Sequence, residues 1–159
     1  MKILATVFLL VSCTHLWAQN SVNILVSLSP AGSFNAVTDK VKGRLEKNQT
    51  GFSSKRIELN IRSLKTGIEL RDQHFWEHLN YKTNSKATLS ELKAQANTGS
   101  AMLEVNGVKI PVTISYQDKG GHVDANFKVK ASDFKLSPKS YLGVGVNDEV
   151  TINVKMDYK

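Results

Sequence analysis

Residues 102–116 read Met-Leu-Glu-Val-Asn-Gly-Val-Lys-Ile-Pro-Val-Thr-Ile-Ser-Tyr, and this stretch decides the fold. The pair Asn106-Gly107 predicts a two-residue hairpin turn, because Asn and Gly best tolerate the positive φ angles of a type I′ turn. The turn fixes the register of the two flanking strands. The residues that oppose each other on one face are apolar: Val105 and Val108, Leu103 and Ile110, Ala101 and Val112. Glu104 and Lys109 oppose each other on the other face.

This alternation of apolar and polar residues indicates strands that are buried on one side and solvated on the other. An antiparallel sheet or barrel provides that environment, whereas a parallel sheet is covered on both faces. Pro111 has no N–H to donate. It must therefore interrupt pairing with the strand beyond the hairpin, where we expect a bulge or a locally open edge.

The same alternation recurs along the chain and predicts an all-β domain. Further strands are expected at residues 22–28, 39–47, 56–62, 87–94, 123–129 and 150–157. Gly43 predicts a bend in the second of them. Glu69 to Asn80 carries helix formers and predicts one short helix.

Eight or nine strands with one helix favour an antiparallel up-and-down barrel, because closure removes exposed strand edges. At about eight strands, such a barrel is wide enough to hold one small ligand. A sandwich of two sheets would bury the same alternate faces. Periodicity alone therefore leaves both architectures open.

The first eighteen residues have the pattern of a secretory signal peptide. Lys2 precedes the apolar run Ile3 to Val11, which is too short to span a bilayer, and Ala18 is a small residue at the cleavage position. We therefore expect a signal peptide at 1–18 and one domain at 19–159. The expected location is the bacterial periplasm or the medium.

Cys13 is the single cysteine of the chain. Cleavage after Ala18 would leave a domain without a disulfide, a thiolate metal ligand or a cysteine nucleophile, so its stability would depend on an apolar core. The alternative is a lipoprotein anchored at Cys13, since Leu10-Val11-Ser12-Cys13 has the residue types of a lipid-modified site.

The formal net charge is +7 at pH 7. A basic balance can indicate nucleic acid or an anionic membrane as the partner. Here Lys and Arg are scattered among Asp and Glu, with no run of five or more like charges. We therefore expect no nucleic-acid partner, while peripheral contact with a membrane surface stays open.

His74-Phe75-Trp76-Glu77-His78 spells the inverted zinc-protease motif. On a helix, both imidazoles would share one face and could bind Zn²⁺ while Glu77 acted as a base. Such enzymes need a third ligand from a second helix, and no segment of this sequence supplies one. We therefore expect no metal, no cofactor and no catalysis. A metal-dependent hydrolase is the least favoured alternative.

Four motifs in order resemble the YceI-like family, whose members are exported bacterial lipocalin-like barrels that bind polyisoprenoid lipids. The motifs are Thr66-Gly67 with Arg71-Asp72-Gln73-His74, the hairpin from Leu103 to Val112, Ala131 to Phe134, and Asn147 to Ile152. The resemblance implies a structural role for Arg71, Asp72 and His74, which would pin the helix to the barrel.

Our interpretation is a non-catalytic exported barrel that contains a polyisoprenoid or similar long apolar lipid. Such a tail is bound through the apolar area removed from water, at roughly 25 cal/mol per Å², without specific polar partners. The candidate ligand-binding residues are inward strand positions and two aromatic residues of a lid helix: Val26, Leu59, Ile61, Phe75, Trp76, Val112 and Phe127.

The alternative is a solid-core module of the cell envelope that binds a protein or a glycan. The same inward apolar residues could fill a core or line a lipid cavity. The two interpretations differ in whether the interior is hollow. The sequence leaves the oligomeric state open.

Overall fold

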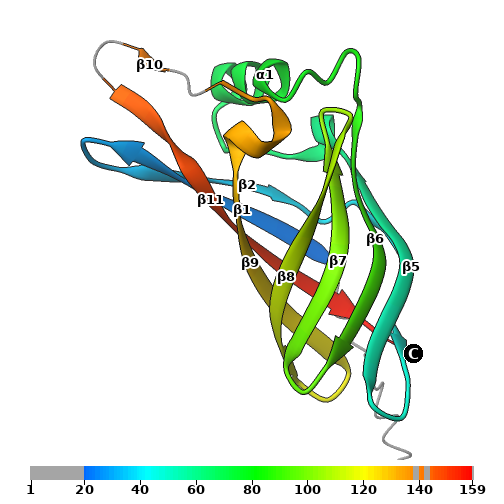
Figure 1. Cartoon of the computed structure of the whole chain (residues 1–159). Helices are drawn as coiled ribbons and strands as arrows, with labels where there is room; N and C mark the ends of the chain where they lie inside the picture. Colours follow the sequence, from blue (N-terminus) through cyan, green and yellow to red (C-terminus); the bar gives the residue numbers. More distant parts are fainter. Residues whose placement is uncertain (1–19, 138–139, 142–143, 159) are drawn as a thin grey trace, which may run out of the picture.

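The computed structural model describes residues 20–137, 140–141 and 144–158. The expected signal peptide and Cys13 lie outside the described residues. Figure 1 shows antiparallel strands wrapped into a barrel, with a helix across one end. In this view the helix marks the upper end, and most of the strand-to-strand turns mark the lower end.

The elements follow one another along the chain with short connections. The strands are β1 (Ser21–Ser29), β2 (Ser33–Thr38), β3 (Val41–Gly43), β4 (Glu46–Lys47), β5 (Gly51–Asn60), β6 (Lys86–Gln95), β7 (Thr98–Val105), β8 (Val108–Asp118), β9 (His122–Lys130), β10 (Ser140–Tyr141) and β11 (Val144–Asp157). The helices are the 3₁₀ turn η1 (Ile61–Ser63), α1 (Glu69–His78) and the 3₁₀ turn η2 (Ala131–Phe134).

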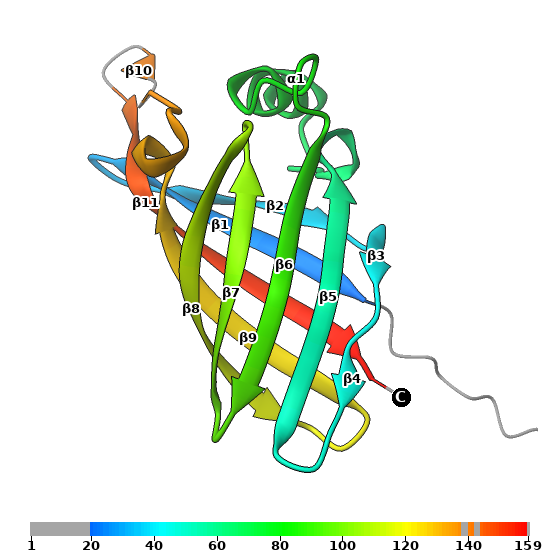
Figure 2. The same ribbon diagram turned by 45° about the vertical axis from the view of Figure 1, so that its right-hand side comes forward.

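The strands form one sheet in the order β2-β1-β11-β9-β8-β7-β6-β5-β3. The segment that carries β2, β3 and β4 is bent, and it pairs first with β1 and then with β5. Because this segment joins the two edges of the sheet, the wall is a nearly closed up-and-down barrel (Figure 2). The predicted barrel is therefore confirmed, and the sandwich is not formed.

Local geometry explains where the predicted strands differ from the observed ones. The strand expected at 39–47 is divided at its bend, where Gly43 has φ +133° and an added Cβ would lie 2.5 Å from the Arg56 carbonyl oxygen. The strand expected at 56–62 ends at Asn60, because the Asn60 side chain accepts a hydrogen bond from the Arg62 N–H and begins η1. β2 and β10 were missed, since neither has a clear apolar alternation.

The central hairpin has the predicted register, with Leu103 opposite Ile110 across β7 and β8. Asn106 and Gly107 have φ angles of +52° and +72°, as a type I′ turn requires. Among the described residues, β8 pairs with β9 only over the four residues from Ser115 to Asp118. The open edge expected near Pro111 is therefore confirmed.

Side chains fill the lower end of the barrel except for a void of about 40 Å³. Phe52 packs edge-on against Tyr116, with ring centroids 5.5 Å apart, and also contacts Tyr158 at 4.9 Å. Below these rings, Lys47 Nζ donates to Asp118 Oδ2 at 2.8 Å, and the Tyr158 hydroxyl donates to Asp118 Oδ1 at 2.7 Å. This network ties β4, β8 and the end of β11 together and closes the lower end.

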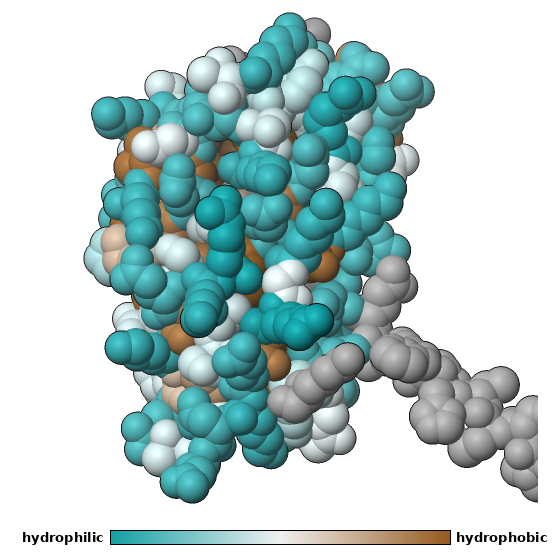
Figure 3. All heavy atoms as spheres, turned by 90° about the vertical axis from the view of Figure 1, so that its right-hand side faces the viewer, coloured by the Kyte–Doolittle hydropathy of each residue, from teal (hydrophilic) through white to brown (hydrophobic). Residues whose placement is uncertain are grey.

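The outer surface contrasts with this interior. Figure 3 shows the side of the barrel that carries β5 and β6, where hydrophilic side chains cover most of the face and apolar atoms show between them. The alternation read from the sequence thus places polar groups in water and apolar groups inside.

The first prediction concerns the lower network. The hydrogen bonds from Lys47, Tyr158 and the Gly120 N–H lower the pKa of Asp118 from 3.8 to about 2. Because this pKa is lower in the folded state than in the unfolded chain, ionised Asp118 stabilises the fold at every pH above its ordinary pKa. This stabilisation is lost as the pH falls from about 4 through about 2. We expect Asp118→Asn to lower the melting temperature at pH 7 and to reduce its fall between pH 5 and pH 2.

The matched control is Glu46→Gln, which removes an exposed carboxylate from β4. Thermal unfolding of the wild type and both variants across this pH range checks the prediction. Parallel pH profiles for the wild type and Asp118→Asn would contradict it.

Candidate functional site

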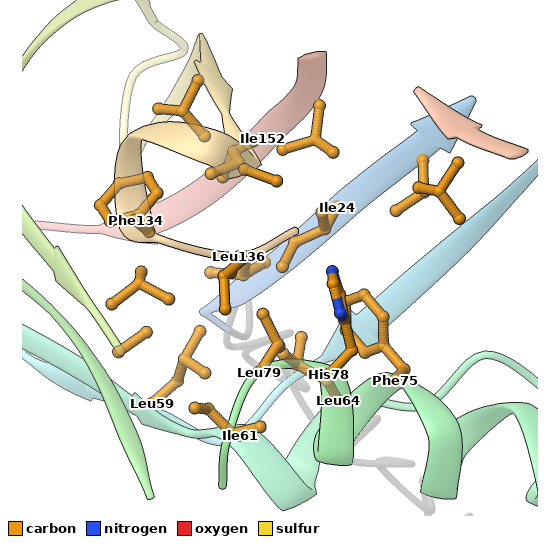
Figure 4. Close-up of a pocket in the computed structure, with 18 of the residues that line it drawn as sticks. Ile24, Leu59, Ile61, Leu64, Phe75, His78, Leu79, Phe134, Leu136 and Ile152 are labelled. Atoms are coloured by element: carbon orange, nitrogen blue, oxygen red, sulfur yellow. The ribbon is translucent and has the colours of Figure 1, made fainter. Parts of the chain in front are cut away.

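The upper half of the barrel encloses a cavity of about 1020 Å³. This volume lies at the top of the range of about 300–1,000 Å³ that small-molecule pockets occupy. Inward residues of six strands form most of its wall: Val22, Ile24, Val26 and Leu28 of β1, Ile57 and Leu59 of β5, Ala87 and Leu89 of β6, Leu103 and Val105 of β7, Phe127 and Val129 of β9, and Val150, Ile152 and Val154 of β11. Figure 4 shows Ile24, Leu59 and Ile152 of this wall around the same space that Phe75 and His78 of the helix border.

The size of the inward side chains explains why only the upper half is hollow. A barrel of about eight strands is just wide enough for large side chains to fill it. Phe52 and Tyr116 fill the lower half, whereas Val and Ile dominate the upper wall and leave the axis open. The aromatic rings of Phe52 and Tyr116 thus lie where the cavity ends.

The helix α1 crosses the upper end as a lid, and Asp72 anchors its first turn. The Thr66 N–H and hydroxyl donate to Asp72 Oδ1 at 2.6 and 2.7 Å, and Lys65 Nζ lies 3.4 Å from Oδ2. Burial alone would raise the pKa of Asp72, but these partners outweigh burial and keep that pKa below its ordinary value. Asp72 thus binds the lid to the loop that precedes it.

Arg71 makes a second attachment on the other side of the lid. Its Nη2 donates to the Thr66 carbonyl oxygen at 2.6 Å, and its guanidinium lies 4.8 Å from the centroid of the Phe34 ring. Phe34 of β2 in turn contacts Phe75 of α1 edge-on at 6.0 Å. The lid is therefore fixed to β2 by stacked groups that also border the cavity.

The third attachment is a cluster of asparagines at the C-terminal end of the lid. The side-chain amides of Asn80 and Asn84 donate to Asn106 Oδ1 at 2.9 and 3.2 Å. Asn106 Nδ2 donates to the Phe134 carbonyl oxygen at 3.0 Å. One side chain in the β7–β8 turn therefore connects the lid with η2.

Five of the seven residues predicted to contact a ligand line the cavity: Val26, Leu59, Ile61, Phe75 and Phe127. Phe75 rises from the lid beside His78 in Figure 4. Positions 71, 74, 75 and 78 of the lid all line the cavity, with the spacing of one helix face. His74 therefore contributes to the cavity, while Arg71 and Asp72 attach the lid as described above.

The structure places Trp76 and Val112 elsewhere. Trp76 follows Phe75 on the helix and so points about 100° away from it. Its Nε1 donates to the Leu64 carbonyl oxygen at 2.8 Å, and Lys65 Nζ lies 4.3 Å from its ring centroid. Val112 is buried in the apolar core but does not line the cavity. η2 packs against β8 and covers part of this wall.

Sequence reasoning missed the cavity residues that lie outside regular strands. They are Leu64, Leu79, Phe134 and Leu136. Val144 and Val146, at the start of β11, were missed as well. Phe134 is only 1% exposed and, with Leu136, follows β9 as Phe-Lys-Leu. Two apolar residues spaced by one polar residue in a short connection were the available signal.

The cavity opens between the start of α1 and the start of β11. Ile68, Leu70 and Val144 line the cavity and remain 53%, 61% and 43% exposed. Both ribbon views place these two elements at the upper end of the barrel (Figures 1 and 2). The opening therefore has an apolar rim in contact with water.

The residues of the possible zinc motif lie on the lid. His74, Glu77 and His78 border the cavity, with His74 and Glu77 exposed. Within the described part of the chain, no group of three or more His, Cys, Asp or Glu side chains is placed to bind a metal ion. The hydrolase alternative thus lacks a third ligand there.

No helix in the described ranges has the length and apolar character needed to cross a bilayer.

Comparison with known proteins adds a family and a fold. The profile of the YceI-like domain family matches residues 14–158. No curated protein sequence matches the chain.

Three solved structures share the barrel at low sequence identity. BcnA of Burkholderia cenocepacia is 16% identical with a TM-score of 0.68, over 86% of this chain and 94% of that one. A polyisoprenoid binding domain from Saccharophagus degradans, implicated in plant cell wall breakdown, is 17% identical with a TM-score of 0.61, over 86% and 91%. The YceI protein of Campylobacter jejuni is 19% identical with a TM-score of 0.55, over 75% and 81%.

The second prediction concerns the asparagine cluster. Asn106→Gly keeps the positive φ of the turn but removes the hydrogen bonds to Asn80, Asn84 and the Phe134 carbonyl. We expect a loss of about 1–2 kcal/mol in unfolding free energy, from neutral hydrogen bonds each contributing about 1 kcal/mol. Amide hydrogen exchange in α1 and η2 should become faster.

The control is Asn97→Gly, since Asn97 has φ +68° in the β6–β7 turn at the opposite end of the barrel. Hydrogen-exchange mass spectrometry compares the two variants. Unchanged exchange in α1 and η2 of Asn106→Gly would show that the cluster does not restrain the lid.

Proposed function

This chain belongs to the YceI-like domain family, and we propose that it is a non-catalytic carrier of one long apolar lipid, such as a polyisoprenoid. The barrel wall would replace the hydrocarbon of a membrane around the lipid tail. No bond is made or broken in this mechanism. The protein lowers the free energy of a lipid molecule that has left the bilayer.

One observation carries this proposal, namely the large hydrocarbon-lined cavity in the upper barrel. Val, Ile, Leu and Phe side chains make up most of the lining, and the polar lining residues lie mainly on the lid. A flexible tail without polar groups suits such walls, because its affinity comes from the apolar area removed from water, at roughly 25 cal/mol per Å². The similar barrel from Saccharophagus degradans, described as polyisoprenoid binding, supports the same ligand class.

The hollow interior counts against the alternative of a solid-core interaction module. That module requires the inward side chains to fill the barrel, and here they do so only in the lower half. The same residues in the upper half leave room for a ligand.

We further propose that the carrier is exported and works in the bacterial periplasm or outside the cell. Lys2 and the apolar run from Ile3 to Val11 support a signal peptide ending at residue 18. Export with a lipid anchor at Cys13 is the minor alternative. Either route would place the carrier next to a membrane that supplies the lipid.

The apolar rim supports transfer by contact with a membrane surface. Ile68, Leu70 and Val144 would enter the interfacial region while the lipid passes between α1 and β11. The net positive charge of the chain would attract an anionic surface. Contact would also spare the lipid tail a passage through water.

The third prediction tests the cavity with two neighbouring residues of β11. Ile152 lines the cavity, whereas Asn153 is exposed on the outer face. We expect Ile152→Trp to fill the cavity and to remove most of the lipid that copurifies with the wild type. Asn153→Trp should retain the lipid.

Denaturing extraction followed by mass spectrometry measures lipid per protein, with far-ultraviolet circular dichroism as the test of folding. Wild-type protein that is reproducibly empty after purification without detergent would overturn the carrier proposal. Equal lipid in the two variants would show that the ligand lies outside the cavity.

The fourth prediction tests the rim. Leu70→Gln should slow the transfer of a fluorescent lipid from anionic vesicles to the protein several-fold, because the rim contacts the membrane during transfer. Val37→Gln is the control, since Val37 is also an exposed apolar residue but does not line the cavity. Equal slowing in both variants would contradict a specific role of the rim.

A further inference from the structure

The lid differs chemically from the walls that it covers. The walls present aliphatic and aromatic side chains, whereas the cavity-facing side of α1 carries Arg71, His74 and His78 beside Phe75. A hydrocarbon ligand alone gains nothing from such a roof, because buried polar groups are stabilised only by hydrogen-bonding or charged partners. The polar groups therefore indicate where the head group of an amphiphile would lie.

The guanidinium of Arg71 contacts a carbonyl oxygen and an aromatic ring rather than a carboxylate. Its hydrogen bond goes to the Thr66 carbonyl and its face lies on Phe34, while its Nε–H is buried without a hydrogen-bond partner. No ion pair of Arg71 is found within the described ranges. A cation in this position stabilises an anion that enters the adjacent cavity.

The acidic residues around the cavity do not pair with Arg71. The Asp72 carboxylate is held by Thr66 and Lys65, and Asp72 does not line the cavity. Glu58 lines the cavity but pairs with Lys86 at 2.9 Å and with Arg56 at 3.1 Å. Glu77 also borders the cavity but is exposed, so water screens its charge.

We propose that the lipid carries an anionic head group, a carboxylate or a phosphate, which lies under the lid against Arg71, His74 and His78. This inference rests on the carrier function proposed above. The orientation follows from the geometry: the head group lies at the polar lid, and the tail runs down to the aromatic side chains that fill the lower barrel. Charge-assisted hydrogen bonds at the lid then add selectivity to an affinity that comes mainly from the tail.

The test compares three ligands with the same twelve-carbon chain, namely dodecanoate, dodecyl phosphate and dodecanol. Each is titrated into delipidated protein by isothermal calorimetry at pH 7.5, below its micelle concentration. We expect at least one anion to bind about tenfold or more tightly than the alcohol, the scale of one charge-assisted hydrogen bond in a partly shielded site. The tighter anion identifies the head-group class.

The variants locate the effect. Arg71→Gln should remove most of the difference in affinity between the anion and dodecanol, while dodecanol still binds. Arg62→Gln removes the same charge from outside the cavity, where Arg62 stacks near Trp76 at 5.7 Å, and should keep the difference. If Arg71→Gln no longer binds dodecanol, His74→Gln takes its place in the test. It should reduce the ratio of anion affinity to dodecanol affinity about twofold, a small effect because the His74 side chain is exposed to water.

The outcomes separate the two proposals. Dodecanol that binds wild-type protein as tightly as both anions overturns the head-group inference and leaves the carrier function standing. The head-group inference is also overturned if Arg71→Gln binds dodecanol normally and still prefers the anion. If Arg71→Gln does not bind dodecanol, an unchanged anion preference in His74→Gln overturns it. Failure of all three ligands to bind overturns the carrier function itself.

Discussion

The backbone hydrogen-bond ladder that runs round the barrel is the constraint on which the interior depends. From β5 to β9 each strand pairs with the next one along the chain, β9 pairs with β11 and β11 pairs with β1, so the bent segment from Ser33 to Lys47 is all that is needed to join the edges. In a closed wall, every second side chain of each strand faces a common interior. The connection between β2 and β3, where pairing passes from β1 to β5, therefore closes the wall around the cavity.

Within that wall, side-chain volume divides the barrel into two parts with different roles. The aromatic rings around Phe52 and the network of Lys47, Asp118 and Tyr158 stabilise the lower end. The upper end is left hollow and is covered by a lid that is attached at both ends by hydrogen bonds. The stabilising contacts of the lower end and the cavity are thus located in different parts of one continuous sheet.

The fold could be predicted because its main signals are local. Asn106-Gly107 fixed a register that the structure reproduces, and Pro111 predicted the open edge of β8. The cavity was harder to predict. Alternation identified wall residues such as Val26 and Leu59, but the orientation of the lid depends on contacts between distant residues, so Trp76 was placed wrongly and Phe134 was missed. Connections without periodicity carry no comparable signal.

The incomplete pairing of β8 with β9 has a mechanical consequence. From Val108 to Ile114 the wall at this edge is completed by the packing of η2 and the Phe134 ring rather than by peptide hydrogen bonds. Separating the wall there costs apolar contact but breaks no rung of the ladder. Widening of the barrel along this edge would therefore leave the strand pairing intact, and it would let apolar tails of different thickness enter the same cavity.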